Sequence, residues 1–236
     1  MKFLKDECLY VTPDNKYDLI RSSIKYLTTD DFTILVRFKP DWDVMDPNDL
    51  SSEGGLVAKN GMHCGLMVRK DNINGVDGYF GKCIFFSEKE PGHPIVNESI
   101  IELEKKEDWY EFSMRHDLKN KKVNFKYENI TKEIEYEGDI IDYSHSWIWI
   151  GACCGLNFFD KTHRHYFNGE IDYVAIFQSY LGDDRVEEYF KNSEPSILNV
   201  NDNVILISNF KNSTPYKVKD DSGNGNNLII FSDEWF

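Results

Sequence analysis

Basic residues, regularly spaced cysteines and long apolar runs are all scarce in this chain. Of its 236 residues, 27 are lysine or arginine and 41 are aspartate or glutamate, so the formal net charge at pH 7 is −14. A surface of this sign repels phosphate backbones and anionic lipid head groups, and no basic patch along the chain opposes it. The composition therefore predicts no nucleic-acid partner.

The sequence also lacks the segments that insert a chain into a membrane or export it. Its most nearly apolar run, Trp147 to Phe159, spans about 13 residues and contains two glycines and an asparagine, whereas a membrane helix needs about 20. Acidic residues stand near the N-terminus, where a secretory signal has its apolar stretch. We therefore expect no membrane insertion. The compartment is unknown from the residues, and a cytoplasmic or virion-associated location is expected ahead of classical secretion.

Five cysteines are too few and too irregularly spaced to form a disulfide framework. They are Cys8, Cys64, Cys83, Cys153 and Cys154. The last two are adjacent, which is poor geometry for a mutual bridge. We interpret the cysteines as reduced thiols that pack as small apolar side chains. With 41% hydrophobic and 14% aromatic residues, the chain can build one substantial core without disulfides or metal.

Helical periodicity is nearly absent, while apolar and polar residues alternate in short runs separated by turn residues. The alternation is cleanest from Lys122 to Tyr127. One short helix is predicted from Asp183 or Asp184 to about Phe190, because acidic residues occupy its first turn and Val186 lies four residues before Phe190. This pattern predicts an all-β fold, an antiparallel two-sheet β-sandwich of the jelly-roll type with one short helix.

The expected strands cover most of the chain. They lie at residues 4–11, 32–39, 55–59, 64–69, 79–86, 109–117, 122–127, 131–136, 147–151, 167–177 and 204–210. No long linker, low-complexity tract or repeat separates them. We therefore expect a single domain over residues 1–236.

Several segments follow one another in an informative order. Phe32–Pro40 opens with Phe-Thr-Ile and ends with Lys-Pro, Asp108–His116 carries a tryptophan at its start, and Tyr166–Phe177 precedes the predicted helix. Over residues 30–190 this order resembles the laminin-G-like branch of the concanavalin A-like lectin and glucanase fold. The resemblance implies a concanavalin A-like jelly roll and does not identify a ligand.

The final segment departs from that pattern. Val204–Phe210 and Val218–Leu228 resemble an opening segment that commonly precedes such a domain, yet here they come last. Because the first and last strands of a closed sandwich are often neighbours, the same strand pairs can form from the other end of the chain. We expect residues 201–236 to be a C-terminal strand segment that packs on the laminin-G-like domain. The alternative is that they begin another unit.

The resemblance extends to glucan hydrolases, whose strand signature is Glu-x-Asp followed by a second glutamate. Glu170 and Asp172 supply the first two acidic positions, but Val174 and Ala175 stand where the second glutamate would be. Retaining hydrolysis requires a pair of carboxyl groups. The chain also lacks a Gly-x-Ser-x-Gly elbow, a dinucleotide fingerprint and a phosphate loop. We therefore predict that the protein is not an enzyme.

A tryptophan pair is the candidate sugar platform. Sugar recognition needs a flat aromatic ring for the apolar pyranose face and polar groups for the hydroxyls. In Trp147-Ile-Trp-Ile150 the alternation places both indoles opposite the isoleucines, which we expect to fill the core. The candidate ligand-binding residues are Trp147, Trp149, Asn157, His165, Tyr166 and Asn168. The alternative is that loops or a partner chain cover the tryptophans.

Two loops rich in Asp and Asn are candidate calcium sites, because the resemblance implies calcium at the rim of many such sandwiches and Ca²⁺ prefers oxygen ligands. The candidate ligands are Asp71, Asn72, Asp77, Asp220, Asp221 and Asn224. The second loop begins like an EF-hand, but its twelfth residue is Phe231 instead of glutamate, so that motif fails. The alternative is that both loops are turns that use glycine and asparagine. No other cofactor is predicted.

These observations favour a noncatalytic, lectin-like carbohydrate-binding module, alone or within a larger assembly. The expected partners are a glycan or a protein, including further copies of the chain. The main alternative is a structural or assembly protein, such as a virion or surface component, that uses the jelly roll for protein–protein packing. The third hypothesis is a glycan hydrolase with an unrecognised site.

Overall fold

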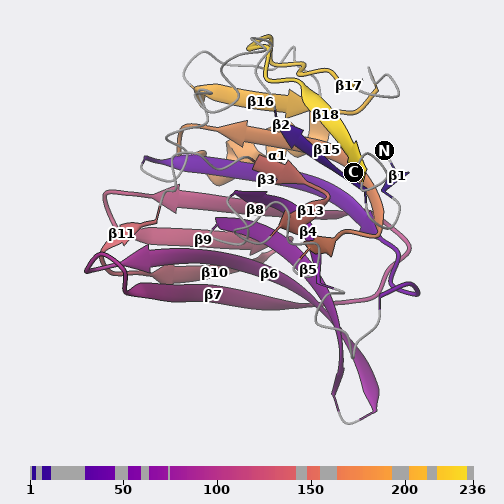
Figure 1. Cartoon of the computed structure of the whole chain (residues 1–236), viewed down its shortest axis with the longest axis horizontal. Helices are drawn as coiled ribbons and strands as arrows, with labels where there is room; N and C mark the ends of the chain where they lie inside the picture. Colours follow the sequence, from indigo (N-terminus) through magenta and orange to yellow (C-terminus); the bar gives the residue numbers. More distant parts are fainter. Residues whose placement is uncertain are drawn as a thin grey trace.

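Antiparallel strands make up most of the chain in a computed structural model (Figure 1). The structure describes residues 2–3, 7–11, 30–45, 53–59, 64–73, 75–141, 148–154, 164–192, 202–211 and 217–232. Within these residues the strands form one sheet of seven strands, one of nine, and a small two-stranded sheet. The predicted all-β, two-sheet antiparallel sandwich is confirmed.

The seven-stranded sheet has the order β1-β15-β3-β8-β9-β10, with β16 also pairing with β15. Its strands are β1 (Lys2–Phe3), β3 (Phe32–Pro40), β8 (Tyr110–Asp117), β9 (Lys122–Tyr127), β10 (Ile130–Glu135), β15 (Gly169–Phe177) and β16 (Val204–Ser208). The β9 strand has the predicted bounds, and its apolar residues are buried at every second position.

The nine-stranded sheet has the order β11-β6-β5-β4-β12-β2-β18-β17, with β7 also pairing with β6. Its strands are β2 (Glu7–Val11), β4 (Gly54–Lys59), β5 (Cys64–Ile73), β6 (Val76–Glu88), β7 (Pro94–Leu103), β11 (Asp139–Ile140), β12 (Ile148–Ile150), β17 (Lys217–Val218) and β18 (Leu228–Ser232). The third sheet pairs β13 (Ala152–Cys154) with β14 (Arg164–Tyr166).

The main core fills the space between the two large sheets. Phe112 lies at its centre, with its ring 4.7 Å from that of Phe38 and 5.1 Å from that of Phe125. The facing sheet contributes Leu66 and Phe85, which are fully buried. Large aromatic side chains of this kind each bury extensive apolar surface, and their edge-to-face contacts add specificity to the packing.

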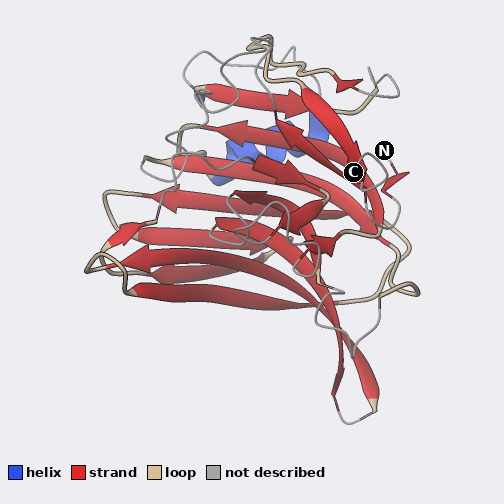
Figure 2. Cartoon of the chain, in the orientation of Figure 1, coloured by secondary structure: helices blue, strands red, loops and turns tan. Residues whose placement is uncertain are grey.

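The helix α1 (Asp183–Asn192) covers the outer face of the seven-stranded sheet, behind β3 and β15 in the view of Figure 2. Its side chains Val186, Tyr189 and Phe190 are buried there against Tyr173, Phe177 and other apolar residues of those strands. Both faces of β15 are therefore buried, which explains the nearly continuous apolar run at its C-terminal half. The predicted helix is confirmed and ends two residues beyond the expected Phe190.

The β5–β6 hairpin is longer than the sequence suggested, and its end projects from the sandwich (Figure 1). The strands stay paired to Ile73 and Val76, whereas we had expected a loop over residues 71–78. The turn contains Gly75 at a φ of 83°, a conformation that glycine adopts without strain. The prediction failed here because the arm is polar and does not alternate as half-buried strands do.

The edge strand β7 was not predicted. Most of its side chains are exposed, and only the residues near its C-terminal end, Ile101 and Leu103, reach the core. The apolar residues Ile95, Val96 and Ile100 remain at the surface. A strand that buries so few side chains carries little of the alternation on which the sequence prediction relies.

Two cysteines confirm the interpretation as buried thiols. Cys64 and Cys83 carry reduced thiols and are fully buried on neighbouring strands of the nine-stranded sheet. Burial raises the pKa of the Cys83 thiol well above its ordinary value, so this group stays protonated and unreactive. The side chains of the other three cysteines lie outside the described residues.

The C-terminal segment contributes a strand to each large sheet. The β16 strand pairs with β15, while β18 pairs with β2 near the other end of the chain. Figure 1 accordingly shows the N- and C-termini close together.

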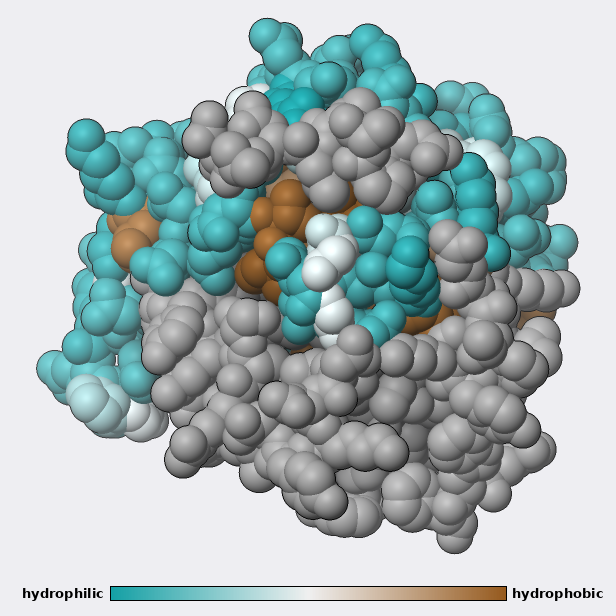
Figure 3. All heavy atoms as spheres, turned by 90° about the horizontal axis from the view of Figure 1, so that it is seen from above, coloured by the Kyte–Doolittle hydropathy of each residue, from teal (hydrophilic) through white to brown (hydrophobic). Residues whose placement is uncertain are grey.

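The surface of the molecule, seen from above, is mostly hydrophilic over the described residues, and hydrophobic atoms show mainly in a recess (Figure 3). Within the described residues, no helix combines the length and apolar composition needed to cross a membrane.

His116 is a buried imidazole whose tautomer is set by its partners. Its Nδ1 lies 2.7 Å from the Asp30 carbonyl oxygen, which can only accept a hydrogen bond, so Nδ1 carries the proton. The Nε2 atom therefore accepts from the Tyr136 hydroxyl at 2.6 Å. Burial lowers the pKa of His116 below its ordinary value, although the hydrogen bond to Asp30 opposes this shift.

We expect this histidine to make the fold sensitive to mild acid. The unfolded chain binds a proton at this imidazole more readily than the folded chain, so the stability from neutral His116 is complete above about pH 6.5 and declines as the pH falls further. Urea unfolding between about pH 7 and pH 5 should show this decline, and His116→Gln should flatten it. His93→Gln, at an exposed histidine in the turn before β7, is the matched control for the substitution itself. An equal slope in His116→Gln and wild type would refute this assignment.

Candidate functional site

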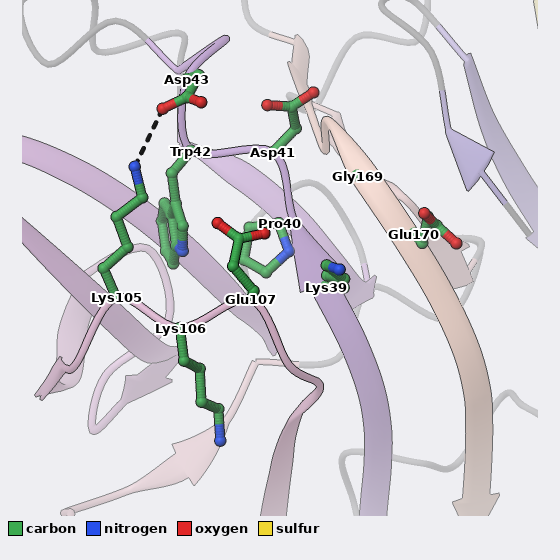
Figure 4. Close-up of a pocket in the computed structure, with 10 residues that line it drawn as sticks. All are labelled: Lys39, Pro40, Asp41, Trp42, Asp43, Lys105, Lys106, Glu107, Gly169 and Glu170. Atoms are coloured by element: carbon green, nitrogen blue, oxygen red, sulfur yellow. Dashed lines mark hydrogen bonds and ion pairs between the residues drawn. The ribbon is translucent and has the colours of Figure 1, made fainter.

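A pocket of about 220 Å³ opens at the end of the sandwich where β3 ends and β15 begins (Figure 4). Three segments of the chain form it: the end of β3 with the turn after it, the connection from β7 to β8, and the start of β15. The lining residues are Lys39, Pro40, Asp41, Trp42, Asp43, Lys105, Lys106, Glu107, Gly169 and Glu170. We call this the rim pocket.

Backbone contacts hold the first and third segments together. Pro40 is paired with Gly169 across the last step of the β3–β15 ladder, and the Asp41 N–H donates to the Asn168 carbonyl at 2.9 Å. Gly169 has a φ of 150°, and a Cβ atom there would lie 2.3 Å from the Lys39 carbonyl oxygen. Only glycine fits at this position, so the floor of the rim pocket is bare backbone.

Trp42 forms a rigid wall of the rim pocket. Its side chain is only 3% exposed, and its indole N–H donates to the Tyr110 hydroxyl at 3.3 Å. That hydroxyl in turn donates to the Glu104 carbonyl at 2.8 Å and accepts the Lys106 N–H at 2.9 Å. The same tyrosine therefore ties the second segment to the tryptophan wall.

Two of the three lysines in the rim pocket are held by other groups. Lys105 forms an ion pair with Asp43 at 3.0 Å, and this hydrogen bond raises the pKa of the lysine. The Lys106 side chain points away from the pocket (Figure 4), and its ammonium group lies 3.0 Å from Glu128. Lys106 lowers the pKa of that carboxyl group.

The remaining polar groups at the mouth are mostly carboxylates. Asp41, Glu107 and Glu170 are exposed there, and the Glu107 side chain extends beside the Pro40 ring (Figure 4). Ionised carboxylates are acceptors only. The rim pocket therefore presents exposed hydrogen-bond acceptors at its mouth, in front of the buried Pro40 and Trp42. This arrangement suits a ligand with several hydroxyl donors.

Sequence reasoning missed this pocket. Its walls come from residues 39–43, 105–107 and 169–170, and no local motif links these segments. The available signal was Asp-Trp-Asp immediately after the strand that ends at Pro40, because an indole flanked by carboxylates in a turn has the composition of a ligand site.

The predicted tryptophan platform is wrong for Trp149. Ile148 and Ile150 do fill the core as expected, but Trp149 is only 5% exposed and cannot offer its ring to solvent. It is paired with Ala58 of β4, so the two side chains share the outer face of the sheet. That face is itself apolar at this point, since Ala58, Met67 and Ile84 are all buried. The alternation therefore predicted correctly that Trp149 lies on the outer face of the sheet, but the prediction that its side chain is exposed to solvent was wrong.

The other predicted ligand residues are distributed along β14 and its neighbours. Tyr166 is buried opposite Ala152, and His165 lies opposite Cys153. Asn168 is half-buried beside the rim pocket, where its carbonyl receives the Asp41 N–H. Trp147 and Asn157 lie outside the described residues. Among the described members of the predicted set, Asn168 alone borders the rim pocket.

Asp220 organises its loop through the backbone. Its two carboxylate oxygens accept the N–H groups of Ile207 at 3.2 Å, Ser222 at 2.9 Å and Asn226 at 3.0 Å. Asn224 donates to the Val204 carbonyl at 2.6 Å, and Asp221 has Lys219 3.9 Å away. A calcium ion on Asp220 would compete with these backbone donors.

The other three candidate calcium ligands lie on the projecting hairpin. Asp71 forms an ion pair with Arg69 at 2.6 Å, and Asp77 forms one with Lys70 at 3.2 Å. The Asn72 amide donates to Asp77 at 3.2 Å. The described part of the chain contains no group of three or more His, Cys, Asp or Glu side chains placed to hold a metal ion. Calcium binding through oxygens of these two loops stays a prediction.

The two acidic residues of β15, Glu170 and Asp172, lie in different environments. Asp172 lies 3.5 Å from Arg37, which also forms an ion pair with Glu111 at 2.8 Å. Glu170 stands at the mouth of the rim pocket. Val174 and Ala175 are fully buried, so this part of the strand presents no further carboxylate.

No family model and no curated protein sequence matches this chain. Among solved structures, a candidate carbohydrate-binding protein from Bacteroides ovatus is similar over 98% of this chain, with a TM-score of 0.61 and 12% identity. This chain spans 60% of that protein's length. The Ruminococcus gnavus IT-sialidase CBM40 bound to alpha2,3 sialyllactose is similar over 79% of this chain and 93% of its own, with a TM-score of 0.53 and 11% identity. At these identities the likeness concerns the fold, and it confirms the concanavalin A-like jelly roll expected from the residues.

Proposed function

We propose that this chain binds carbohydrate without cleaving it and that the rim pocket holds the sugar. The observation that carries the proposal is the group of exposed acceptor carboxylates, with Asp41 and Glu107 among them, at the mouth of a pocket whose inner wall is the nearly buried Trp42. Sugar rings present several hydroxyl donors, and the carboxylates at the mouth supply matching acceptors. The fold shared with a candidate carbohydrate-binding protein and a sialyllactose-bound CBM40 supports the same assignment.

The pocket is preorganised, which raises its affinity for a ligand that makes only a few contacts. Trp42 and the Lys105–Glu107 segment are tied together through Tyr110, and the floor is fixed by the β3–β15 ladder. Little conformational entropy is therefore lost when a ligand enters. Each hydrogen bond from a sugar hydroxyl to an ionised carboxylate is of the stronger, charge-assisted kind.

The charge of the mouth favours neutral glycans over acidic ones. Three lysines line the rim pocket against four carboxylates, and the Lys106 ammonium group is bound to Glu128 outside it. A sialylated sugar would bring a further negative charge next to Asp41, Glu107 and Glu170 and would be repelled. Noncatalytic binding is supported by the pairing of Asp172 with Arg37 and by the apolar Val174 and Ala175 on β15.

A glycan array that contains neutral and sialylated oligosaccharides tests this proposal on the full chain. We expect neutral glycans to bind, and we expect Glu107→Gln to weaken the best ligand by about tenfold or more, because a charge-assisted hydrogen bond is lost. Glu90→Gln serves as the matched control, since Glu90 lies in the exposed turn at the opposite end of β7. Unchanged affinity in both Glu107→Gln and Asp41→Asn, or hydrolysis of the bound glycan, would overturn it.

Assembly through protein–protein packing is the second candidate function. It is favoured by β7, whose residues Ile95, Val96 and Ile100 are exposed on a strand that pairs only with β6 within the described residues. An exposed apolar edge strand is a template for pairing with another chain. The native mass of the protein in solution, measured alongside the glycan array, tests this function. A mass of several chains would indicate assembly, and the mass of one chain would indicate binding by a monomer.

A further inference from the structure

A second pocket, of about 200 Å³, lies between α1 and the outer face of the seven-stranded sheet. Its walls include Ser113 of β8, Lys126 of β9, Glu128 and Asn129 of the β9–β10 turn, and Val186 and Phe190 of α1. None of the residues that line the rim pocket lines this one. We call it the helix pocket.

Ser113 is the unusual residue of the helix pocket. It lies between Phe112 and Met114, which both point into the core, so its own side chain points to the opposite face of the sheet. The residue is 1% exposed, and its hydroxyl has no hydrogen-bond partner in the described part of the chain. A buried hydroxyl without a partner costs free energy of folding that an alanine would not cost. A ligand that hydrogen-bonds to it would recover that cost.

The charged groups of the helix pocket already have partners of opposite sign. Lys126 lies 3.3 Å from Asp183, and Glu128 lies 3.0 Å from Lys106. The two other lining carboxylates are also paired, since Glu111 lies 2.8 Å from Arg37 and Glu187 lies 3.7 Å from Lys191. The pocket therefore offers no uncompensated charge that would select an anion or a cation. Its ligand is expected to be neutral.

The other wall is apolar. Val186 and Phe190 are buried residues of α1 that line the pocket, so a ligand there meets aliphatic and aromatic carbon on one side. On the other side it meets the Ser113 hydroxyl and the Asn129 amide. Pockets for drug-sized molecules measure about 300–1,000 Å³, so this smaller pocket suits a single ring rather than an oligomer.

We propose that the helix pocket is a second carbohydrate site, which takes one neutral sugar ring. The apolar face of the ring packs on Phe190 and Val186, and one ring hydroxyl hydrogen-bonds to Ser113 Oγ. This site is separate from the rim pocket, so the two proposals can be tested independently. A chain with both sites binds two parts of a branched or dense glycan surface at once, which increases the overall avidity.

Amide chemical shifts of the ¹⁵N-labelled full chain test this proposal, with methyl glycosides of glucose, galactose and mannose as probes. The sugars are added at concentrations above about 1 mM, because binding of a single ring is expected to be weak. We expect at least one of them to shift the amide signals of Ser113, Asn129, Val186 and Phe190. Ser113→Ala should weaken this binding by about tenfold. The same variant, without sugar, should melt no lower than wild type, because the lost hydroxyl had no partner.

Ser87→Ala is the matched control, because Ser87 is also fully buried but its hydroxyl accepts from the Asn97 amide at 3.0 Å. This variant should lower the melting temperature and leave sugar binding at α1 unchanged. Glu107→Gln should also leave the α1 shifts unchanged, which separates failure of the rim pocket from failure of the helix pocket. No shift at α1 with any of the three sugars, or equal affinity in Ser113→Ala and wild type, would overturn the proposal.

Discussion

Deletion of residues 201–236 is expected to unfold the whole chain. The deletion removes β16 from beside β15 and β18 from beside β2, so both large sheets lose a strand. Among the described residues it also removes six apolar side chains that are at least nine-tenths buried, namely Ile205, Leu206, Ile207, Phe210, Val218 and Leu228. Each contributes about 1.5–3 kcal/mol by burial, and the sum is comparable to the entire stability of a domain, about 5–15 kcal/mol.

Circular dichroism and urea unfolding of the truncated chain provide the measurement, with two point variants of the full chain for comparison. Leu206→Ala removes a fully buried side chain and should cost about 2–5 kcal/mol. Lys219→Ala removes an exposed side chain whose nearest ionic partner, Asp221, is 3.9 Å away, and should cost at most about 1 kcal/mol. A truncated chain that unfolds cooperatively at the wild-type midpoint would show that the segment is an appendage and that the domain ends before it.

Trp149→Ala is expected to destabilise the protein by about 3–5 kcal/mol. The side chain is 5% exposed, so its removal leaves a cavity on the apolar outer face near Ala58. Urea unfolding measures the loss directly. Trp109→Ala is the comparison variant, because Trp109 is partly exposed and should cost less.

The same pair of variants separates a structural tryptophan from a sugar platform. If Trp149 were a platform, Trp149→Ala would keep the wild-type unfolding midpoint and lose glycan binding. We expect the reverse: a lower midpoint, with glycan binding retained at temperatures where the variant is still folded. A stable variant that no longer binds sugar would restore the platform and move the binding site away from the rim pocket.

The strands that sequence analysis located best are those with one face in the core and one in water. β9 alternates without interruption, and its bounds agree with the prediction. Strand β7 and the distal part of the β5–β6 hairpin were missed because few of their side chains are buried. A period of two is visible in a sequence only when the two faces of a strand have different environments.

The spacing of apolar residues in the sequence by itself determined the fold class, the short helix and the inward faces of the main strands. It did so because burial of one face requires apolar residues at fixed spacing. Three features were decided only by the tertiary structure: the covering of Trp149, the assembly of the rim pocket from segments centred on Trp42, Lys106 and Gly169, and the placing of α1 over Ser113. Each depends on contacts between residues far apart in the chain, and no local spacing encodes which strands become neighbours or which outer face a helix covers.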